Sequence, residues 1–354
     1  MKIVYILQNL DLTAPNKVIF NIIQNIDADV QIVSLGKSAS QNYKKIALDL
    51  NANIIETKNI FQISKICENK IVHLNGYHPS IVGFFLKILT NCKLISTCHS
   101  NELTETKSHN FIGLKKIKSK IKHIILPILY GLQDFTVAVS NDVRDYLRFL
   151  NLNNIELIHN GIEEINPKKL RKFDNLTFVQ IGHIMNLKNQ LFSLEVIKFF
   201  KQKNIDVKLN IFGKVREDLY KSKLDEFLVT NKIDKNVEFF GSLESEELFE
   251  NIEKSHFCLM PSFSEGLPLS ILESLSLGVP CIVSNNGGMK EAIFDNVNGL
   301  VIDLENDETF EIIFEFCMKS NYEILQKNSI NIIKTNFTAK MMAQKYFHLY
   351  MKLK

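Results

Sequence analysis

The sequence predicts an α/β protein with two domains, each built on a doubly wound parallel sheet. Short apolar segments with strand character alternate with helical segments along the 354 residues, and this alternation is typical of parallel strands joined by helices. The alternating series occurs twice, and a polar segment containing a proline, residues 163–173, separates the two runs. The length also suits two domains of ordinary size.

The first series begins with residues 2–7, which are apolar on both faces and therefore read as a buried strand. A loop over residues 8–17 and a helix over residues 18–26 should follow. Further strands are expected at residues 30–35, 54–55, 71–74, 94–97 and 136–139. Ligands of such sheets bind at the carboxyl ends of strands, and two histidines, His73 and His99, fall at such ends.

The second series predicts six strands, at residues 176–181, 207–212, 237–240, 257–260, 280–284 and 299–302. A last helix is expected over about residues 341–350. The second series therefore repeats the architecture of the first.

One stretch, residues 260–292, carries the strongest functional signal. A helix is expected from Pro268 to Leu277, because proline is favoured at the first helical position and Gly278 suits the end. The expected cap, Leu267, has no side-chain acceptor, so the first helical amides form a ready anion site. Glu265 precedes the helix and Glu273 lies inside it. Two carboxylates thus flank a phosphate-sized space, which matches the polyol, diphosphate and ribose of a nucleotide sugar.

This stretch resembles the signature of the retaining glycosyltransferases of family 4, which have the GT-B fold. Their Glu-x7-Glu motif is matched by Glu265 and Glu273, and the surrounding pattern by Pro261, Ser262, Gly266, Pro268, Leu272, Gly278 and Pro280. The resemblance implies two Rossmann-like domains facing across a cleft, with Glu265 on the donor sugar and Glu273 on the ribose. It also places the diphosphate at Gly266, Leu267, Pro268 and Leu269. The alternative is an ordinary βαβ crossover with two solvated glutamates.

Other segments of the second series are similar to the same family. Residues 182–189 resemble a Gly-Arg-x4-Lys motif that neutralises the donor diphosphate; Lys188 matches it, and His183 stands where arginine is usual. His183 could instead be a structural residue turned away from the donor. Gly213 and Gly241 correspond to strand-end glycines near the base and the diphosphate.

In the first series the resemblance implies that His99, within Thr97-Cys98-His99, hydrogen-bonds a donor-sugar hydroxyl, whereas His73 is structural. The family's first loop faces the acceptor and carries a glycine pair. Here that place is taken by Ala14, Pro15, Asn16 and Lys17. Lys17 either meets an acceptor phosphate or is a solvated lysine at the start of a helix.

The resemblance divides the chain into an acceptor-binding domain, residues 1–165, and a nucleotide-sugar-binding domain, residues 174–335. Residues 336–354 should form a helix that packs back on the first domain. Residues 107–123 hold six lysines and no acid, and a basic amphipathic helix of this kind reads as a membrane-surface element. The alternative is a solvated helix packed on its own domain.

Composition limits the remaining possibilities. A formal net charge of +3 gives no argument for a nucleic-acid partner, and the six cysteines form no Cys-x-x-Cys pair, as expected of reduced thiols in the cytoplasm. The first apolar run is too short for a signal peptide, and no run approaches the length needed to span a bilayer. We therefore expect a cytoplasmic protein, with peripheral contact to the anionic inner face of the membrane.

Taken together, the sequence predicts a metal-independent hexosyltransferase that needs no cofactor and uses a nucleoside-diphosphate sugar, with a UDP-sugar favoured. The acceptor would be a glycan or a lipid-linked glycan of bacterial surface polysaccharide synthesis. Asp27 and Asp29 form an Asp-x-Asp pair, but it lies in a turn rather than in a metal-binding context. Two alternatives are a nucleotide-sugar 2-epimerase of the same fold and a non-catalytic nucleotide-sugar-binding subunit.

Overall fold

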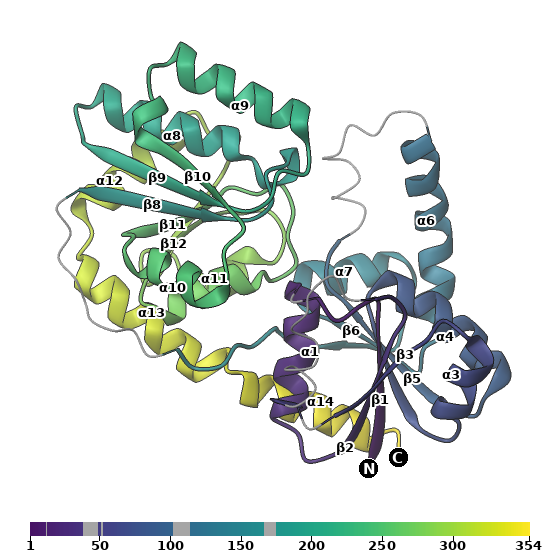
Figure 1. The fold of residues 1–354 in the computed structure, drawn as a ribbon. Helices are drawn as coiled ribbons and strands as arrows, with labels where there is room; N and C mark the ends of the chain where they lie inside the picture. The colour runs from purple at the N-terminus through teal and green to yellow at the C-terminus, as the bar shows by residue number, and fades with distance from the viewer. Residues whose placement is uncertain (12, 38–48, 51, 102–113, 166–174) are drawn as a thin grey trace. The chain divides into compact units, whose positions relative to one another are not determined.

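The computed structural model describes the chain except residues 12, 38–48, 51, 102–113 and 166–174 (Figure 1). It divides into two compact units. The first unit comprises the described parts of Met1–Leu103, Phe111–Glu163 and Phe337–Lys354. The second unit comprises the described parts of Glu164–Asn336.

The first unit is built on a seven-stranded sheet in which every strand pair is parallel. Its strands lie in the order β3 (Asn53–Glu56), β2 (Asp29–Ser34), β1 (Lys2–Leu7), β4 (Ile71–Asn75), β5 (Lys93–Cys98), β6 (Phe135–Ala138) and β7 (Ile155–Leu157). The six predicted strands are all present, and the short edge strand β7 was not predicted. The strand order reverses between β1 and β4, which is where ligands bind such sheets.

Helices cover both faces of this sheet (Figure 1): α1 (Ala14–Gln24), α3 (Ile60–Cys67), α4 (Tyr77–Leu89), α6 (Leu114–Gly131), α7 (Asn141–Phe149) and α14 (Ala339–Met351). Helix α1 begins at Ala14, so the prediction of a loop as far as Lys17 is wrong. Pro15 lies in the first turn of α1, where a backbone N–H has no intrahelical partner and proline is tolerated.

Two tyrosines of α14 join a buried polar network on one face of the first sheet. The Tyr350 hydroxyl hydrogen-bonds both Tyr5 (3.1 Å) and His73 Nδ1 (2.7 Å). Thr97 Oγ1 hydrogen-bonds His73 Nε2 (2.7 Å) and the Tyr346 hydroxyl (3.0 Å). Burial, aided by the nearby His99, lowers the pKa of His73 to about 3, so its ring is neutral at neutral pH. The network therefore attaches the end of the chain to the first unit.

The second unit is built on a six-stranded parallel sheet. Its order is β10 (Val237–Gly241), β9 (Val207–Phe212), β8 (Leu176–Ile181), β11 (Phe257–Met260), β12 (Cys281–Ser284) and β13 (Gly299–Ile302). All six strands were predicted. Its helices are α8 (Gln190–Gln202), α9 (Asp218–Thr230), α10 (Ser245–Glu253), α11 (Leu269–Ser276), α12 (Thr309–Lys319) and α13 (Tyr322–Asn336). The strand order reverses between β8 and β11.

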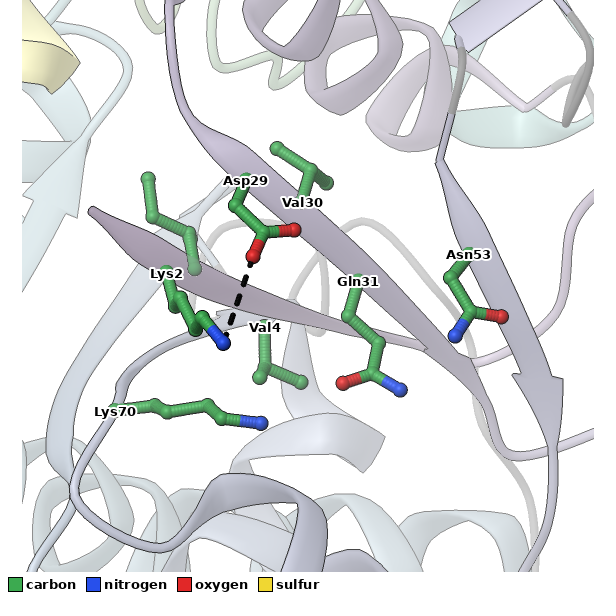
Figure 2. A pocket seen from close by; sticks show the side chains of 8 residues that line it. Lys2, Val4, Asp29, Val30, Gln31, Asn53 and Lys70 are labelled. Carbon is green, nitrogen blue, oxygen red and sulfur yellow. Dashed lines mark ion pairs between the residues drawn. The ribbon is translucent and has the colours of Figure 1, made fainter.

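The amino edge of the first sheet carries a shallow polar depression (Figure 2). Lys2, Asp29, Gln31, Asn53 and Lys70 line it, and Lys2 faces Asp29 at 3.9 Å. Both side chains of that pair are about two-thirds exposed, so the depression is open surface. It lies at the edge opposite to the carboxyl ends of the strands. Among the described residues, no helix combines the length and apolar character needed to cross a membrane.

The tyrosine network predicts a graded loss of stability. Tyr350→Phe removes two buried hydrogen bonds and leaves His73 Nδ1 without its partner, while His73 Nε2 keeps its bond to Thr97. This loss costs about 1–3 kcal/mol of unfolding free energy. Tyr346→Phe removes one bond to Thr97, which keeps its bond to His73, and should cost less. Urea unfolding of both variants measures the difference. A Tyr350→Phe loss no larger than that of Tyr346→Phe would contradict this account of the network.

Candidate functional site

Part of the carboxyl edge of the second sheet, at the ends of β8, β9 and β10, carries no side chains. Gly182, Gly213 and Gly241 end three adjacent strands, with φ of +155°, +151° and +72°. A Cβ on Gly213 would lie 2.0 Å from the carbonyl oxygen of Gly182, and the Gly213 N–H donates to the Gly241 carbonyl at 2.7 Å. A side chain at Gly213 is therefore excluded, and the edge can accept a ligand close to its backbone.

Lys188 is held against this edge by its own backbone. It ends a 3-10 turn, Asn186–Lys188, and the following Asn189 has the left-handed conformation at φ +50°. Gln180, on β8, donates from Nε2 to the Lys188 carbonyl at 2.8 Å. The aliphatic stem lies along Gly182, where a Cβ would meet Lys188 Cδ and Cε at 3.2 Å. The ammonium is therefore fixed at the point where the strand order reverses.

Lys188 Nζ forms an ion pair and hydrogen bond with Glu265 Oε1. The Glu265 side chain is 13% exposed and that of Lys188 18%. The Glu265 carbonyl accepts from the Gly288 N–H at 3.0 Å. Gly287 has φ +69°, and a Cβ there would lie 2.3 Å from the same carbonyl oxygen. Gly287 thus lets the loop after β12 meet the loop that carries Glu265, and this contact fixes the backbone of Glu265.

Helix α11 starts one residue later than predicted, because Pro268 is its N-cap and Leu269 its first residue. The cap supplies no side-chain hydrogen bond, so the expected helix start without a side-chain cap is present. At the other end Gly278 has φ +75°, and its N–H and that of Val279 donate to the carbonyls of Leu275 and Ser274. This is a Schellman cap. Glu273, inside the helix, is 7% exposed.

His183 lies beside a group of cations. Partial burial, together with Arg216, Lys188 and Lys214, lowers the pKa of His183 below its ordinary value of 6.5. The loop that carries His183 is held by Ile184, which pairs with Val215. Lys214 and Arg216 were not among the predicted site residues. The feature that could have identified them is their position in the loop after Gly213, which follows the end of β9.

The first unit places His99 in a second polar cluster. His99 Nε2 hydrogen-bonds Asn75 Oδ1 at 2.6 Å, and Asn75 Nδ2 donates to Asn16 Oδ1 at 3.1 Å. Burial lowers the pKa of His99 to about 4, so the ring is neutral at neutral pH. Asn16 is 4% exposed, so its side chain serves the packing of the first loop. Ala14, Pro15 and Lys17 occupy the same first turn of α1.

The predicted residues therefore form two clusters, one in each unit. The second-unit cluster combines cations, a helix start without a side-chain cap, an open backbone edge and two carboxylates, which suits a phosphorylated polyol. Gly266, Leu267, Pro268 and Leu269 form its loop and helix start. Among the described residues, no group of three His, Cys, Asp or Glu side chains is placed to hold a metal ion.

Comparisons with known proteins agree with this chemistry. The family described as Glycosyl transferases group 1 matches residues 161–334, and Glycosyltransferase Family 4 matches residues 53–164. The O-antigen biosynthesis glycosyltransferase WclY of Escherichia coli is 27% identical over 372 residues, covering 100% of this chain and 99% of that protein. A UDP-Gal:alpha-D-GlcNAc-diphosphoundecaprenol alpha-1,3-galactosyltransferase of Escherichia coli is 26% identical over 218 residues, 56% of this chain and 54% of that protein.

A solved structure has the same fold. Anabaena Alr3699/HepE in complex with UDP-glucose matches with a TM-score of 0.83 at 13% identity, covering 99% of this chain and 100% of that one. Fold and sequence together define a glycosyltransferase of the GT-B class. The chain belongs to the family 4 glycosyltransferases, as its sequence predicted.

The contact between Gly287 and Glu265 gives a prediction on ligand binding. Gly287→Ala should displace Glu265 and weaken UDP binding at least tenfold, about 1.4 kcal/mol. Gly278→Ala is the matched control, because it has a similar φ of +75° but its Cβ would meet only the Ile330 and Gln326 side chains. Both variants should lose about 1–2 kcal/mol of stability from backbone strain. Equal UDP affinities for the two variants, measured by calorimetry, would contradict a specific role for this contact.

Proposed function

We propose that this glycosyltransferase retains anomeric configuration and moves a hexose from a UDP-sugar to a glycan or lipid-linked acceptor of surface polysaccharide synthesis. The single observation that carries the donor assignment is the Lys188–Glu265 pair beside the bare glycine edge and the start of α11. The named activities of the two Escherichia coli relatives support the acceptor class. The UDP-glucose in the Anabaena structure supports the donor.

In this proposal the diphosphate takes the place of Glu265 as the partner of Lys188. Backbone N–H groups of Gly266, Leu267 and Leu269 bind its oxygens, since Pro268 has no N–H to donate. Glu265, released from the ammonium, then accepts hydrogen bonds from sugar hydroxyls. Glu273 would accept hydrogen bonds from the ribose hydroxyls. Carboxylate–hydroxyl bonds of this kind are among the stronger hydrogen bonds in proteins.

The transfer proposed is a front-face displacement. The bond between the anomeric carbon and the phosphate oxygen breaks, and a bond from that carbon to the acceptor hydroxyl oxygen forms on the same face. The hydroxyl proton moves to the departing phosphate oxygen. Lys188 and the dipole of α11 stabilise the charge that develops on the leaving phosphate, and Lys214 and Arg216 add to it. We propose that these cations perform the role of a metal, so activity should survive EDTA.

The distinct roles of the two glutamates predict distinct defects. Glu273→Ala should weaken the binding of both UDP and UDP-sugar by about ten- to 150-fold, since a charge-assisted bond contributes 1.5–3 kcal/mol. Glu265→Ala should leave UDP affinity unchanged or tighter, because Lys188 is freed, while turnover falls. Calorimetry and radiolabelled sugar transfer measure the two effects. Equal losses of UDP affinity would show that the roles are wrong, and 2-epimerisation of UDP-GlcNAc without acceptor would favour an epimerase.

His183 predicts a pH dependence of donor binding. A bound diphosphate favours the imidazolium and so raises the pKa of His183 from its lowered value in the free protein. Donor affinity should be greatest below the free-protein pKa and fall as pH rises through the higher, donor-bound pKa. His183→Arg should remove this dependence, because guanidinium stays charged. Titrations of UDP-sugar at several pH values test this, and parallel curves for both proteins would remove His183 from the site.

We also propose that the first unit contacts anionic membranes through a surface of α4 and α6. These helices pack against each other and expose large apolar side chains, namely Phe84, Phe85, Ile88, Ile121, Ile124 and Ile128. Patches of this kind mark interaction sites. The lysines of residues 107–123, which would supply charge, lie outside the described residues or side chains, so the basic amphipathic helix remains a prediction supported by its sequence.

Liposome sedimentation tests the α4–α6 surface. Ile88 and Ile124 are 69% and 70% exposed. The double change to serine should lower the partition onto anionic vesicles by about tenfold or more, because burying each side chain contributes 1.5–3 kcal/mol. The matched control changes Leu219 and Val229 on α9, which are 90% and 72% exposed, to serine. Binding should also weaken as salt rises. Equal pelleting of both double variants would place any membrane contact elsewhere.

A further inference from the structure

A chain of three side chains connects the first loop to His99. Asn16 Nδ2 donates to two backbone carbonyls, those of Asn9 at 2.8 Å and Asp11 at 2.9 Å. Asn16 Oδ1 accepts from Asn75 Nδ2, and Asn75 Oδ1 faces His99 Nε2. Asn16 and Asn75 are both nine-tenths or more buried, so water does not compete for these positions.

The two backbone carbonyls fix the direction of every bond in this chain. A carbonyl only accepts, so the atom of Asn16 that faces Asn9 and Asp11 must be its NH2 group. Its oxygen therefore faces Asn75 and needs a donor, which only the Asn75 NH2 group can supply. The Asn75 oxygen is then turned to His99, and His99 Nε2 must carry the hydrogen.

This direction sets the chemistry of the rest of the ring. A neutral imidazole carries one N–H and one lone pair. With the hydrogen on Nε2, Nδ1 keeps its lone pair. Among the described residues, Nδ1 has no hydrogen-bond partner. It can accept a hydrogen bond from a hydroxyl but cannot donate one to an oxyanion.

We infer that Asn16 and Asn75 are positioning residues that hold His99 in the Nε2–H tautomer, so that Nδ1 accepts a hydrogen bond from a hydroxyl of the donor sugar. The sugar part of this inference rests on the proposed function. The tautomer part rests on the amide chain alone. The first loop, which is far from β5 in sequence, would thus control the tautomer of a residue to which it makes no direct hydrogen bond.

Ring-nitrogen NMR tests the tautomer directly. Protein labelled with 15N-histidine shows, for each ring, which nitrogen carries the hydrogen, and loss of one set of signals in His99→Gln assigns His99. At neutral pH the wild type should show a protonated Nε2 and an unprotonated Nδ1. A protonated Nδ1, or a mixture of the two forms, in the wild type would overturn the inference.

The positioning role is tested by Asn16→Ala, which does not alter any atom in contact with His99. Without Asn16 the Asn75 amide can turn over and present its NH2 group, so the Nδ1–H form should become populated. Asn75→Ala should also populate it. Asn53→Ala is the matched control, because Asn53 is an exposed asparagine at the amino edge of the same sheet (Figure 2). Variants that fold and keep the pure Nε2–H form would show that the chain does not set the tautomer.

Donor affinity separates this inference from the proposed function. If half of the rings change form, the competent fraction is halved, and UDP-sugar affinity should fall about twofold in Asn16→Ala from that population shift alone. UDP itself should bind unchanged, and Asn53→Ala should match the wild type. Failure of the wild type to bind any UDP-sugar would refute the proposed function and leave the NMR result standing. A tautomer shift without any change in UDP-sugar affinity would overturn the role of Nδ1 in sugar binding.

Discussion

The close approach of backbone at the carboxyl edge of the second sheet is the constraint on which the site depends. The carbonyl oxygen of Gly182 occupies the space where a Cβ on Gly213 would lie. Adjacent parallel strands normally end in side chains that fill this edge. Here β8, β9 and β10 end in glycines, so a ligand can lie against peptide groups, and the side chain of Lys188 is held along this edge. The chemistry of the second unit follows from this bare edge.

A second close approach places a carboxylate opposite that lysine. Gly287 and Gly288 let the loop after β12 touch the backbone of Glu265, and the carboxylate then pairs with Lys188. In the free protein the two charges satisfy each other, which avoids a buried unpaired charge. In the proposed mechanism a diphosphate replaces Glu265 as the partner of the ammonium and frees the carboxylate for hydroxyls. This one exchange of partners would prepare both ends of a nucleotide sugar for transfer.

The sequence predicted the parts of the fold that depend on local pattern. All predicted strands are present, because buried parallel strands read as apolar runs whatever their neighbours. Strand β7 was missed because three residues at a sheet edge carry no such run. Helix α1 was predicted to start late because Pro15 and Asn16 read as loop residues. In the structure the Asn16 side chain hydrogen-bonds Asn9, Asp11 and Asn75, and these contacts cannot be read from the local pattern.

The same division holds for the site. Glu265, Glu273 and Lys188 were predicted because their spacing resembles a family motif. The structure adds the Lys188–Glu265 pair, and it adds Lys214 and Arg216, which no motif contains and which face His183 only through the pairing of two loops. The amide chain to His99 was likewise invisible, because it joins residues from three separate elements. Roles that depend on such non-local contacts could not be predicted from the sequence.

The central claim, that Lys188 exchanges Glu265 for the donor diphosphate, is tested most directly by comparing UDP with uridine. Calorimetric titration of both ligands into wild type and Lys188→Met isolates the phosphate contribution, because the base and ribose are common to the two. The account predicts that Lys188→Met loses at least about tenfold in UDP affinity, 1.4 kcal/mol, and keeps its uridine affinity. An unchanged preference for UDP over uridine in Lys188→Met would contradict it.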